Sequence, residues 1–172
     1  MAETSLITIS DVQGYRRISA SFDQTRFDGF VKEAQRTNLR GLLGDALYYA
    51  FMNDARTTGI YKDLLEGKTY VYDGNTIQYY GIKPYLVYIW LAIACREGDL
   101  FLANVGAIEF VNNPQQNFES AKSKDKIAND YMQKAQGYAN DIIKFLNENS
   151  DSYPLWESTD ETNITEFITF KI

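Results

Sequence analysis

The chain of 172 residues contains no histidine, a single cysteine and three prolines. The lack of histidine excludes a Ser-His-Asp triad, a Cys-His dyad and any imidazole general base. Cys95 alone can form neither an intrachain disulfide nor a multi-cysteine zinc site. These absences weaken most of the common enzyme classes, and we expect no catalytic, metal-binding or cofactor-binding residues.

Positive charge and long apolar runs are also scarce. The 17 Lys and Arg residues face 23 Asp and Glu residues, giving a net charge of −6, whereas proteins that grip nucleic-acid phosphates need clustered positive charge. The longest apolar run, residues 85–95, is too short to span a bilayer, and the N-terminus lacks the regions of a secretory signal. We therefore expect a protein that is made in the cytoplasm and does not contact membranes.

Aromatic residues, by contrast, are abundant: 13 Tyr, 10 Phe and two Trp. Such a share indicates either a large core or extensive contact surfaces, because Tyr and Trp are favoured where one end of the side chain is apolar and the other is wet. The length fits one domain with a sizeable core.

Apolar residues recur at helical spacing through most of the chain. Thr8 is expected to cap the first helix, and Ser21 with Gln24 has the form of a capping box for the second. The helix expected at about residues 82–98 is apolar on nearly every side, which places it in the centre of a bundle, and Pro84 fits its first turn. The expected helices cover about residues 7–18, 22–56 (one helix, or two separated near Gly44), 60–65, 82–98 and 118–149.

Two other segments have a different pattern. Residues 68–80 place β-branched and aromatic residues around Asp73-Gly74, which predicts a β-hairpin. Within residues 99–117 we expect one short extended piece, at 104–111, which Asn112-Asn113-Pro114 closes. Residues 164–172 alternate as a strand does, after an acidic, non-helical stretch.

The predicted fold class is therefore mainly α: a helical bundle with a long C-terminal helix, a small β-hairpin insertion and an extended C-terminal strand or tail. Residues 1–149 are expected to form the helical domain, and residues 150–172 a separate docking tail.

Candidates for chemistry are weak. No pair of acidic residues stands out as an acid and base, and Asp73-Gly74-Asn75 lacks the remaining ligands of a calcium loop. Cys95 lies in the apolar helix, where a small buried residue is the better interpretation than a nucleophile. A carboxylate-based or tyrosine-based enzyme is therefore less favoured than a protein that acts by binding partners.

Candidates for contact are stronger. The hairpin residues are either core or interface. Arg36 and Arg40, four residues apart on one helix face, belong to a solvated or subunit-contacting face or, as the less favoured alternative, contact the DNA backbone. For the tail we expect docking on a partner, because an aromatic strand can extend a neighbour's sheet. The predicted docking residues are Tyr153, Leu155, Trp156, Phe167, Ile168 and Phe170, and the predicted hairpin interface is Tyr70, Tyr72, Ile77 and Tyr79.

The segment 7–44 contains a short series of motifs: Thr8, Arg17-Ile18, Asp23, Ala34 and Leu43-Gly44. Through these residues it resembles the opening of head-tail connector proteins of tailed bacteriophages, also called adaptor or ring proteins. The central apolar helix, the Val105-Gly106 turn and the final helix, with Ala135 and Tyr138 to Leu146, are similar to the larger connectors of this type. The hairpin and the tail are closer to the ring proteins of crAss-like phages.

The resemblance implies a structural virion protein that forms a homo-oligomeric ring, commonly of about twelve subunits, at the head-tail junction. Such a ring lies below the portal protein, extends the DNA channel and offers a docking surface to tail or further ring proteins. An acidic channel would let DNA pass without sequence-specific binding. The alternative is a non-enzymatic helical interaction or scaffolding module outside phages, which would form a small complex instead of a ring. If the tail docks, removing residues 150–172 should leave a folded chain that no longer assembles.

Overall fold

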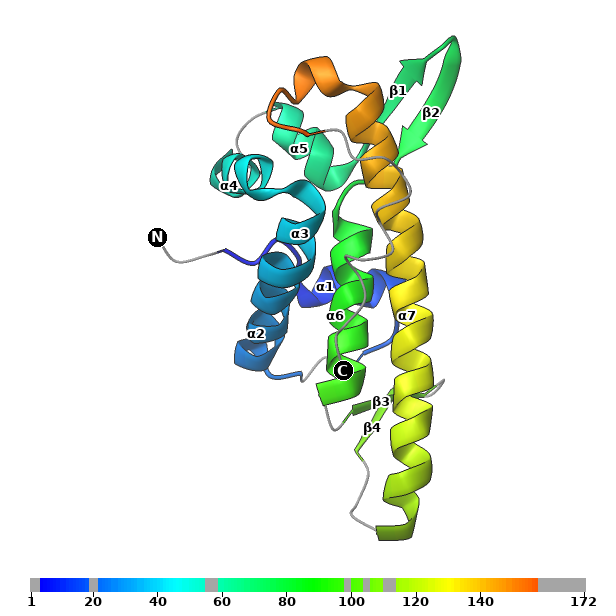
Figure 1. Cartoon of the computed structure of the whole chain (residues 1–172). Helices are drawn as coiled ribbons and strands as arrows, with labels where there is room; N and C mark the ends of the chain where they lie inside the picture. The colour runs from blue at the N-terminus through cyan, green and yellow to red at the C-terminus, as the bar shows by residue number, and fades with distance from the viewer. Residues whose placement is uncertain are drawn as a thin grey trace.

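The computed structural model describes residues 4–18, 22–54, 59–97, 100–103, 106–109 and 114–157, and the side chains of these residues except 97–123. The described part is mainly α-helical, with one long helix, α7, running along the whole body (Figure 1). A π-helix, Gln35–Leu39, joins α2 to α3, and a 3₁₀ turn, Ser150–Ser152, follows α7. The elements are α1 (Ile9–Tyr15), α2 (Gln24–Ala34), α3 (Arg40–Leu43), α4 (Asp45–Asp54), α5 (Gly59–Glu66), β1 (Lys68–Tyr72), β2 (Asn75–Tyr79), α6 (Lys83–Glu97), β3 (Leu100–Ala103), β4 (Gly106–Glu109) and α7 (Pro114–Glu148).

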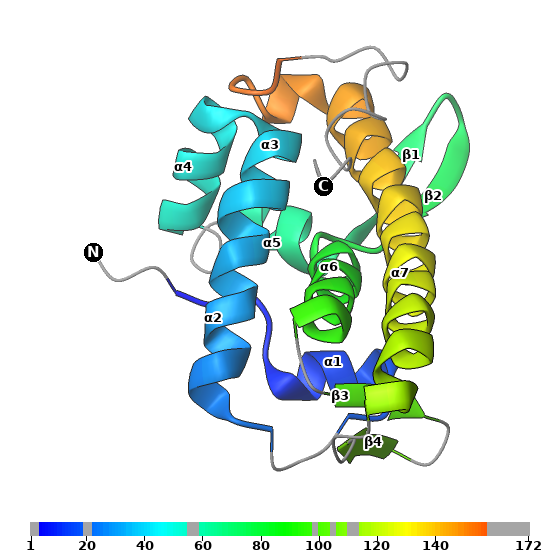
Figure 2. The ribbon, with the colours of Figure 1, turned by 60° about the horizontal axis from the view of Figure 1, so that its bottom comes forward.

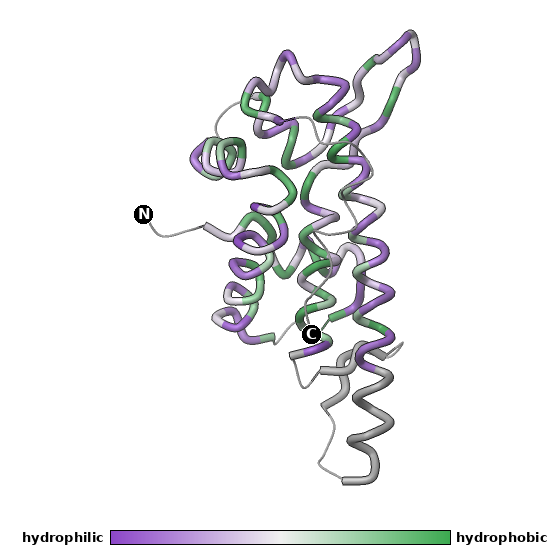
Figure 3. The backbone as a smooth tube through the Cα atoms, in the orientation of Figure 1, coloured by the Kyte–Doolittle hydropathy of each residue, from purple (hydrophilic) through white to green (hydrophobic). Residues whose placement is uncertain are grey.

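Helix α6 is the centre of the bundle. It packs most extensively against α7, and α2 and α1 cover its other sides (Figures 1 and 2). Every residue from Tyr85 to Cys95 is buried, and α6 is hydrophobic along its length in Figure 3. This confirms the predicted central helix, and Pro84 occupies its second position, where a missing N–H costs little.

An aromatic cluster fixes α2 on α6. The ring of Trp90 lies 4.9 Å from that of Phe27 and 5.3 Å from that of Phe22, centroid to centroid. Its indole Nε1 donates a hydrogen bond to the Phe27 carbonyl at 3.3 Å. A buried indole thus keeps a polar partner inside an otherwise apolar interface.

The helix starts agree with the sequence at α1 and differ at α2. Thr8 and Asp11 form a reciprocal capping box at α1, so the predicted cap is confirmed. At α2 the predicted box of Ser21 and Gln24 is wrong, because Asp23 is the N-cap and its carboxylate accepts from the Arg26 N–H at 2.7 Å. Asp and Ser are about equally good caps, so their order along the chain does not decide between them.

The region predicted as one or two helices contains a break at Gly44, which has a φ of +73°. This confirms the second option, and the chain turns there from α3 into α4 (Figure 1). Before the break, the π-helix carries Gln35, whose side chain is fully buried. Its Oε1 accepts from the Leu6 N–H at 2.8 Å and its Nε2 donates to the Thr4 carbonyl at 3.3 Å, so Gln35 ties the N-terminal segment to the bundle.

Strands β1 and β2 form the predicted hairpin, with Tyr72 paired to Asn75 at its end. Asp73 (φ +48°) and Gly74 (φ +74°) both adopt positive φ, as a type I′ turn requires. At the base of the hairpin a Cβ on Gly67 would overlap the Tyr79 carbonyl oxygen, so only glycine allows the two chain segments to meet.

The region after α6 departs from prediction. Strands β3 and β4 form a second antiparallel hairpin where we expected one extended piece. The last helix begins at Pro114, about one turn earlier than predicted, because proline fits the first helical position and does not close the preceding segment. With 35 residues α7 is about 52 Å long.

The described chain continues to Glu157 and stays on the helical body (Figure 2). The predicted domain boundary at residue 150 is therefore too early, since residues 153 and 156 are buried with the bundle core. The predicted strand at 164–172, with Phe167, Ile168 and Phe170, lies outside the described residues. Within the described part of the chain no helix is long and apolar enough to cross a membrane.

Candidate interaction surfaces

The β1–β2 hairpin has one anchored face. Tyr70, Tyr72, Ile77 and Tyr79 lie on the same face of the ladder, as the pairing of Tyr70 with Ile77 shows. The Tyr79 ring stacks on that of Phe145 at 4.0 Å, and the Tyr70 ring meets it edge-on at 5.2 Å. Tyr70 and Tyr79 are thus core residues rather than interface residues, and Ile77 is half-buried.

The far end of the hairpin is exposed. Tyr72 keeps 47% of its accessible surface and Val71 keeps 69%, and the hairpin projects past the end of α7 in Figure 1. Tyr80, just after β2, is 59% exposed. An exposed apolar group on a two-stranded hairpin with unpaired edges is a typical contact surface. Of the four predicted hairpin residues, Tyr72 alone is left well exposed.

Two of the predicted docking residues belong to the core instead. Tyr153 is buried and donates a hydrogen bond through its hydroxyl to the Ile60 carbonyl at 2.8 Å. Trp156 is also buried, and its Nε1 donates to Asn147 Oδ1 at 2.8 Å. Their burial corrects the prediction that they face a partner, whereas Leu155 between them remains 44% exposed.

The two arginines predicted to face a subunit or DNA have different surroundings. Arg40 forms a two-pronged ion pair with Asp45, at 2.7 and 3.0 Å, and its guanidinium lies over the Tyr49 ring. The hydrogen bond and charge of Asp45 raise the pKa of Arg40, and Arg40 lowers the pKa of Asp45. A DNA phosphate would have to compete with this carboxylate. Arg36 lies exposed on the π-helix.

A tyrosine cluster that the sequence did not reveal joins α1, α6 and α7. Its members are Tyr15, Tyr88, Tyr131 and Tyr138, and Tyr88 is the hub, stacked on Tyr138 at 5.7 Å and near Tyr131 at 6.1 Å. Lys134 and Arg16 lie within 5.9 Å of the Tyr88 and Tyr131 ring centres. Tyr88 and Tyr131 are themselves buried, so these cation–π contacts cover rings that belong to the core. The seven-residue spacing of Tyr131 and Tyr138 on α7 was the only local signal.

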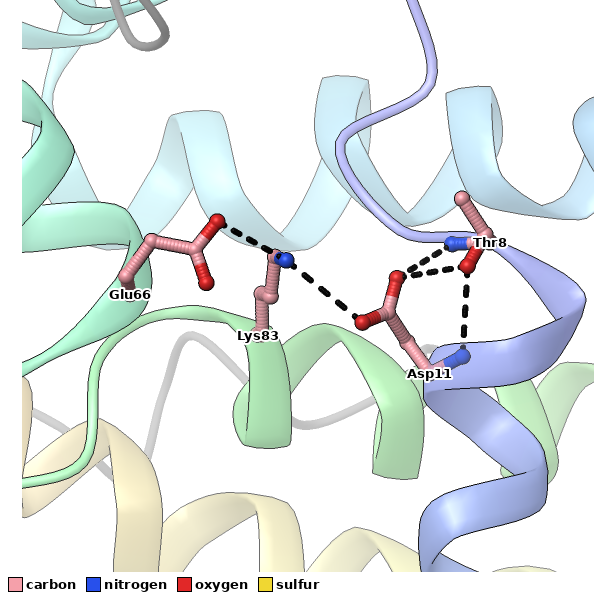
Figure 4. Close-up of polar contacts among 4 residues, drawn as sticks. All are labelled: Thr8, Asp11, Glu66 and Lys83. Atoms are coloured by element: carbon pink, nitrogen blue, oxygen red, sulfur yellow. Dashed lines mark hydrogen bonds and ion pairs between the residues drawn. The ribbon is translucent and has the colours of Figure 1, made fainter.

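A polar cluster links α1, α5 and α6 (Figure 4). Asp11 accepts hydrogen bonds from the Thr8 N–H and hydroxyl at 2.8 Å, and Lys83 lies 3.4 Å from Asp11 and 2.9 Å from Glu66. Burial alone would raise the pKa of Asp11, but the Thr8 hydrogen bonds and Lys83 lower it below its usual value.

The same contacts act on the lysine. Burial alone would lower the pKa of Lys83, but Glu66 and Asp11 raise it above its usual value. Lys83 therefore stays a cation at neutral pH and cannot act as a nucleophile or base. The cluster ties three helices together, and its chemistry is that of an ion pair, not of an active site.

The Cys95 thiol and possible groups of metal-ligating side chains are the remaining candidates for chemistry. Burial raises the pKa of the Cys95 thiol to about 11, so the thiolate is scarce at neutral pH. Among the described residues no group of three or more His, Cys, Asp or Glu is placed to hold a metal ion.

A cavity of about 460 Å³, the C-terminal groove, lies between the α3–α4 turn, the end of α7 and residues 155–157. Its volume is within the range of small-ligand pockets, and its lining is mostly apolar, with Asp45 and Glu157 as the acidic members. The lining includes Leu43, Gly44, Ala46, Ile143, Leu155 and Trp156.

Comparison with known proteins gives one match. The model of a family of unknown function, DUF6712, matches residues 39–166, which run from the π-helix through α7 to beyond the described chain. No curated protein and no solved structure matches the chain. Because the family model covers about three quarters of the sequence, the chain belongs to the DUF6712 family.

Proposed function

We propose that this protein is a structural virion protein that forms a ring between the portal and the tail of a bacteriophage. The observation that carries the proposal is the projecting hairpin, which is anchored on one side and exposes Tyr72 and Val71 at its end. The function is assembly, and the ring, commonly of about twelve copies, extends the DNA channel below the portal.

The base of the hairpin is anchored on the helical body, and its far end is exposed for contact. Stacking on Phe145 fixes its base, while the exposed end presents an aromatic and a β-branched side chain. Aromatic residues are enriched at the centres of protein interfaces, and a rigid element loses little conformational entropy when it binds. A hairpin that fits a different surface on the next copy makes a head-to-tail contact, which is the kind that closes into a ring.

Helix α7 gives the subunit an elongated shape. It runs past both ends of α6, with the β1–β2 hairpin at one end and the β3–β4 hairpin at the other (Figure 1). An elongated subunit with a hairpin at either end suits a ring that must reach two neighbours, a portal above and a tail component below.

The charge of the chain supports passage of DNA without binding. The net charge is −6, and the guanidinium of Arg40 is already occupied by Asp45. Affinity for phosphate depends on available cations, so a lumen lined by this subunit would hold DNA weakly.

Co-expression with the portal protein of the same genome tests the proposal. We expect a particle carrying about twelve copies of the 19.7 kDa chain, visible as a ring by electron microscopy. Tyr72→Lys should prevent ring closure, because a charge would be buried at the interface, while Thr25→Lys, which adds the same charge on exposed α2, should not. A small complex of fixed stoichiometry would favour the scaffolding module outside phages instead.

A further inference from the structure

We propose that the C-terminal residues 164–172 of the chain dock into the C-terminal groove of their own subunit. This inference goes beyond the proposed function, since it concerns the single subunit and does not depend on a ring. The groove, the position of Glu157 and the sequence that follows support it.

The groove has the chemistry of a peptide site. Ile143 and Leu43 line it and are buried, while Leu155, which also lines it, keeps 44% of its surface exposed. Gly44 and Ala46 are also in the lining, and such short side chains leave room for another chain segment to approach closely. An apolar cavity of about 460 Å³ open to water is unfavourable until apolar groups fill it.

The lining of the groove carries little uncompensated charge. Asp45 and Glu157 are its two acidic residues, and Asp45 is held by Arg40 through two hydrogen bonds. The groove therefore favours a segment that is apolar and near neutral over a strongly charged one.

The chain supplies such a segment close by. Residues 164–172 read ITEFITFKI, with one acidic and one basic residue, and Phe167, Ile168 and Phe170 among the apolar ones. The last described residue, Glu157, itself lines the groove. The six residues 158–163 can span up to about 20 Å, which is enough for the chain to turn back into the groove.

The short tether selects the same subunit over another copy. A linker of six residues gives an effective concentration of roughly 1 mM, far above a protein concentration of roughly 1 μM. A segment with an intermolecular Kd of roughly 0.1 mM would then be bound about ten to one in its own groove and scarcely at all in another subunit's.

Chymotrypsin cleavage after Phe167 and Phe170 tests the docking in the full chain. Ala46→Arg should speed this cleavage about tenfold, because the arginine fills the groove. Asn53→Arg, exposed on the same helix α4 but outside the groove lining, should leave the rate unchanged. Equal rates in the wild type and Ala46→Arg would overturn the proposal.

Two further readouts separate docking within a subunit from other causes. Protection within a subunit should be the same at about 1 and about 50 μM protein, and protection that appears only at the higher concentration would overturn the proposal by assigning the groove to a second copy's tail. The double variant Phe167→Ser/Phe170→Ser should speed hydrogen exchange of the residue 41–46 amides about tenfold, and unchanged exchange there would contradict docking. Neither readout depends on ring formation, so failure of one proposal leaves the other open.

Discussion

Removing the Phe145 ring should destabilise the protein, because this ring anchors the base of the β1–β2 hairpin, whereas the exposed end of the hairpin contributes little to stability. Phe145 is 1% exposed, and three tyrosine rings contact it: Tyr79 at 4.0 Å, Tyr70 at 5.2 Å and Tyr153 at 5.7 Å. A Phe→Ala substitution at a buried site costs about 3–5 kcal/mol through lost transfer energy and the cavity left behind. Phe145→Ala should fall in the upper half of that range, because it also removes three aromatic pairs, each contributing about 0.5–1.5 kcal/mol.

The assay is urea unfolding followed by circular dichroism, with the thermal midpoint as a second measure. For a chain of this length the expected loss corresponds to a fall in Tm of about 10 °C. Tyr72→Ala is the matched control, since it removes an aromatic ring at the exposed end of the same hairpin and should change stability by less than about 0.5 kcal/mol. A loss below about 1.5 kcal/mol for Phe145→Ala, or a comparable loss for Tyr72→Ala, would refute this division of the hairpin.

Three further predictions follow from local geometry. Asp11→Asn should lower the free energy of unfolding by about 1 kcal/mol at pH 7. Because the folded state lowers the pKa of Asp11, this loss of stability should persist above pH 3.8 and vanish as the pH falls through the lowered pKa. Urea unfolding of both proteins across this pH range measures it. Gly67→Ala should cost about 2 kcal/mol or more, since φ is +91° and the Cβ would overlap the Tyr79 carbonyl, whereas Gly29→Ala in α2, with open space around it, should gain up to about 1 kcal/mol in the same assay. Cys95, with a pKa of about 11 against 9.0 for a free thiol, should react with iodoacetamide about 100-fold more slowly in the folded chain than in urea, and equal rates would contradict its burial.

The sequence predicted the elements whose cause is local. The Asp73-Gly74 turn has the backbone preference of a type I′ hairpin, and it formed where expected. The apolar helix α6 could be placed at the centre because no face of it was polar.

Features that depend on tertiary contacts were missed. Tyr153 and Trp156 look like an exposed aromatic tail until the hydrogen bond from Tyr153 to Ile60, 93 residues away, is known. The tyrosine cluster draws on three helices, so no single window of sequence contains it. The hairpin of β3 and β4 lacks an Asn-Gly or Asp-Gly turn in the sequence. The helical spacing of apolar residues in α7 did not reveal that this helix begins at Pro114.

For the β1–β2 hairpin, the sequence predicted which residues share a face but not which of them are buried. Tyr70, Tyr72, Ile77 and Tyr79 were correctly grouped by alternation, since they share one face of the ladder. Alternation could not show where along that face the contact with Phe145 ends, so it did not separate the core residues Tyr70 and Tyr79 from exposed Tyr72.

Cryo-electron microscopy of the intact virion, with subunits counted at the head-tail junction, tests the proposed ring most directly. We predict a closed ring of about twelve copies between portal and tail, with Tyr72 of each copy buried against its neighbour. A head-tail junction that lacks this chain would contradict the proposed function, as would a ring in which the β1–β2 hairpin contacts no neighbouring subunit.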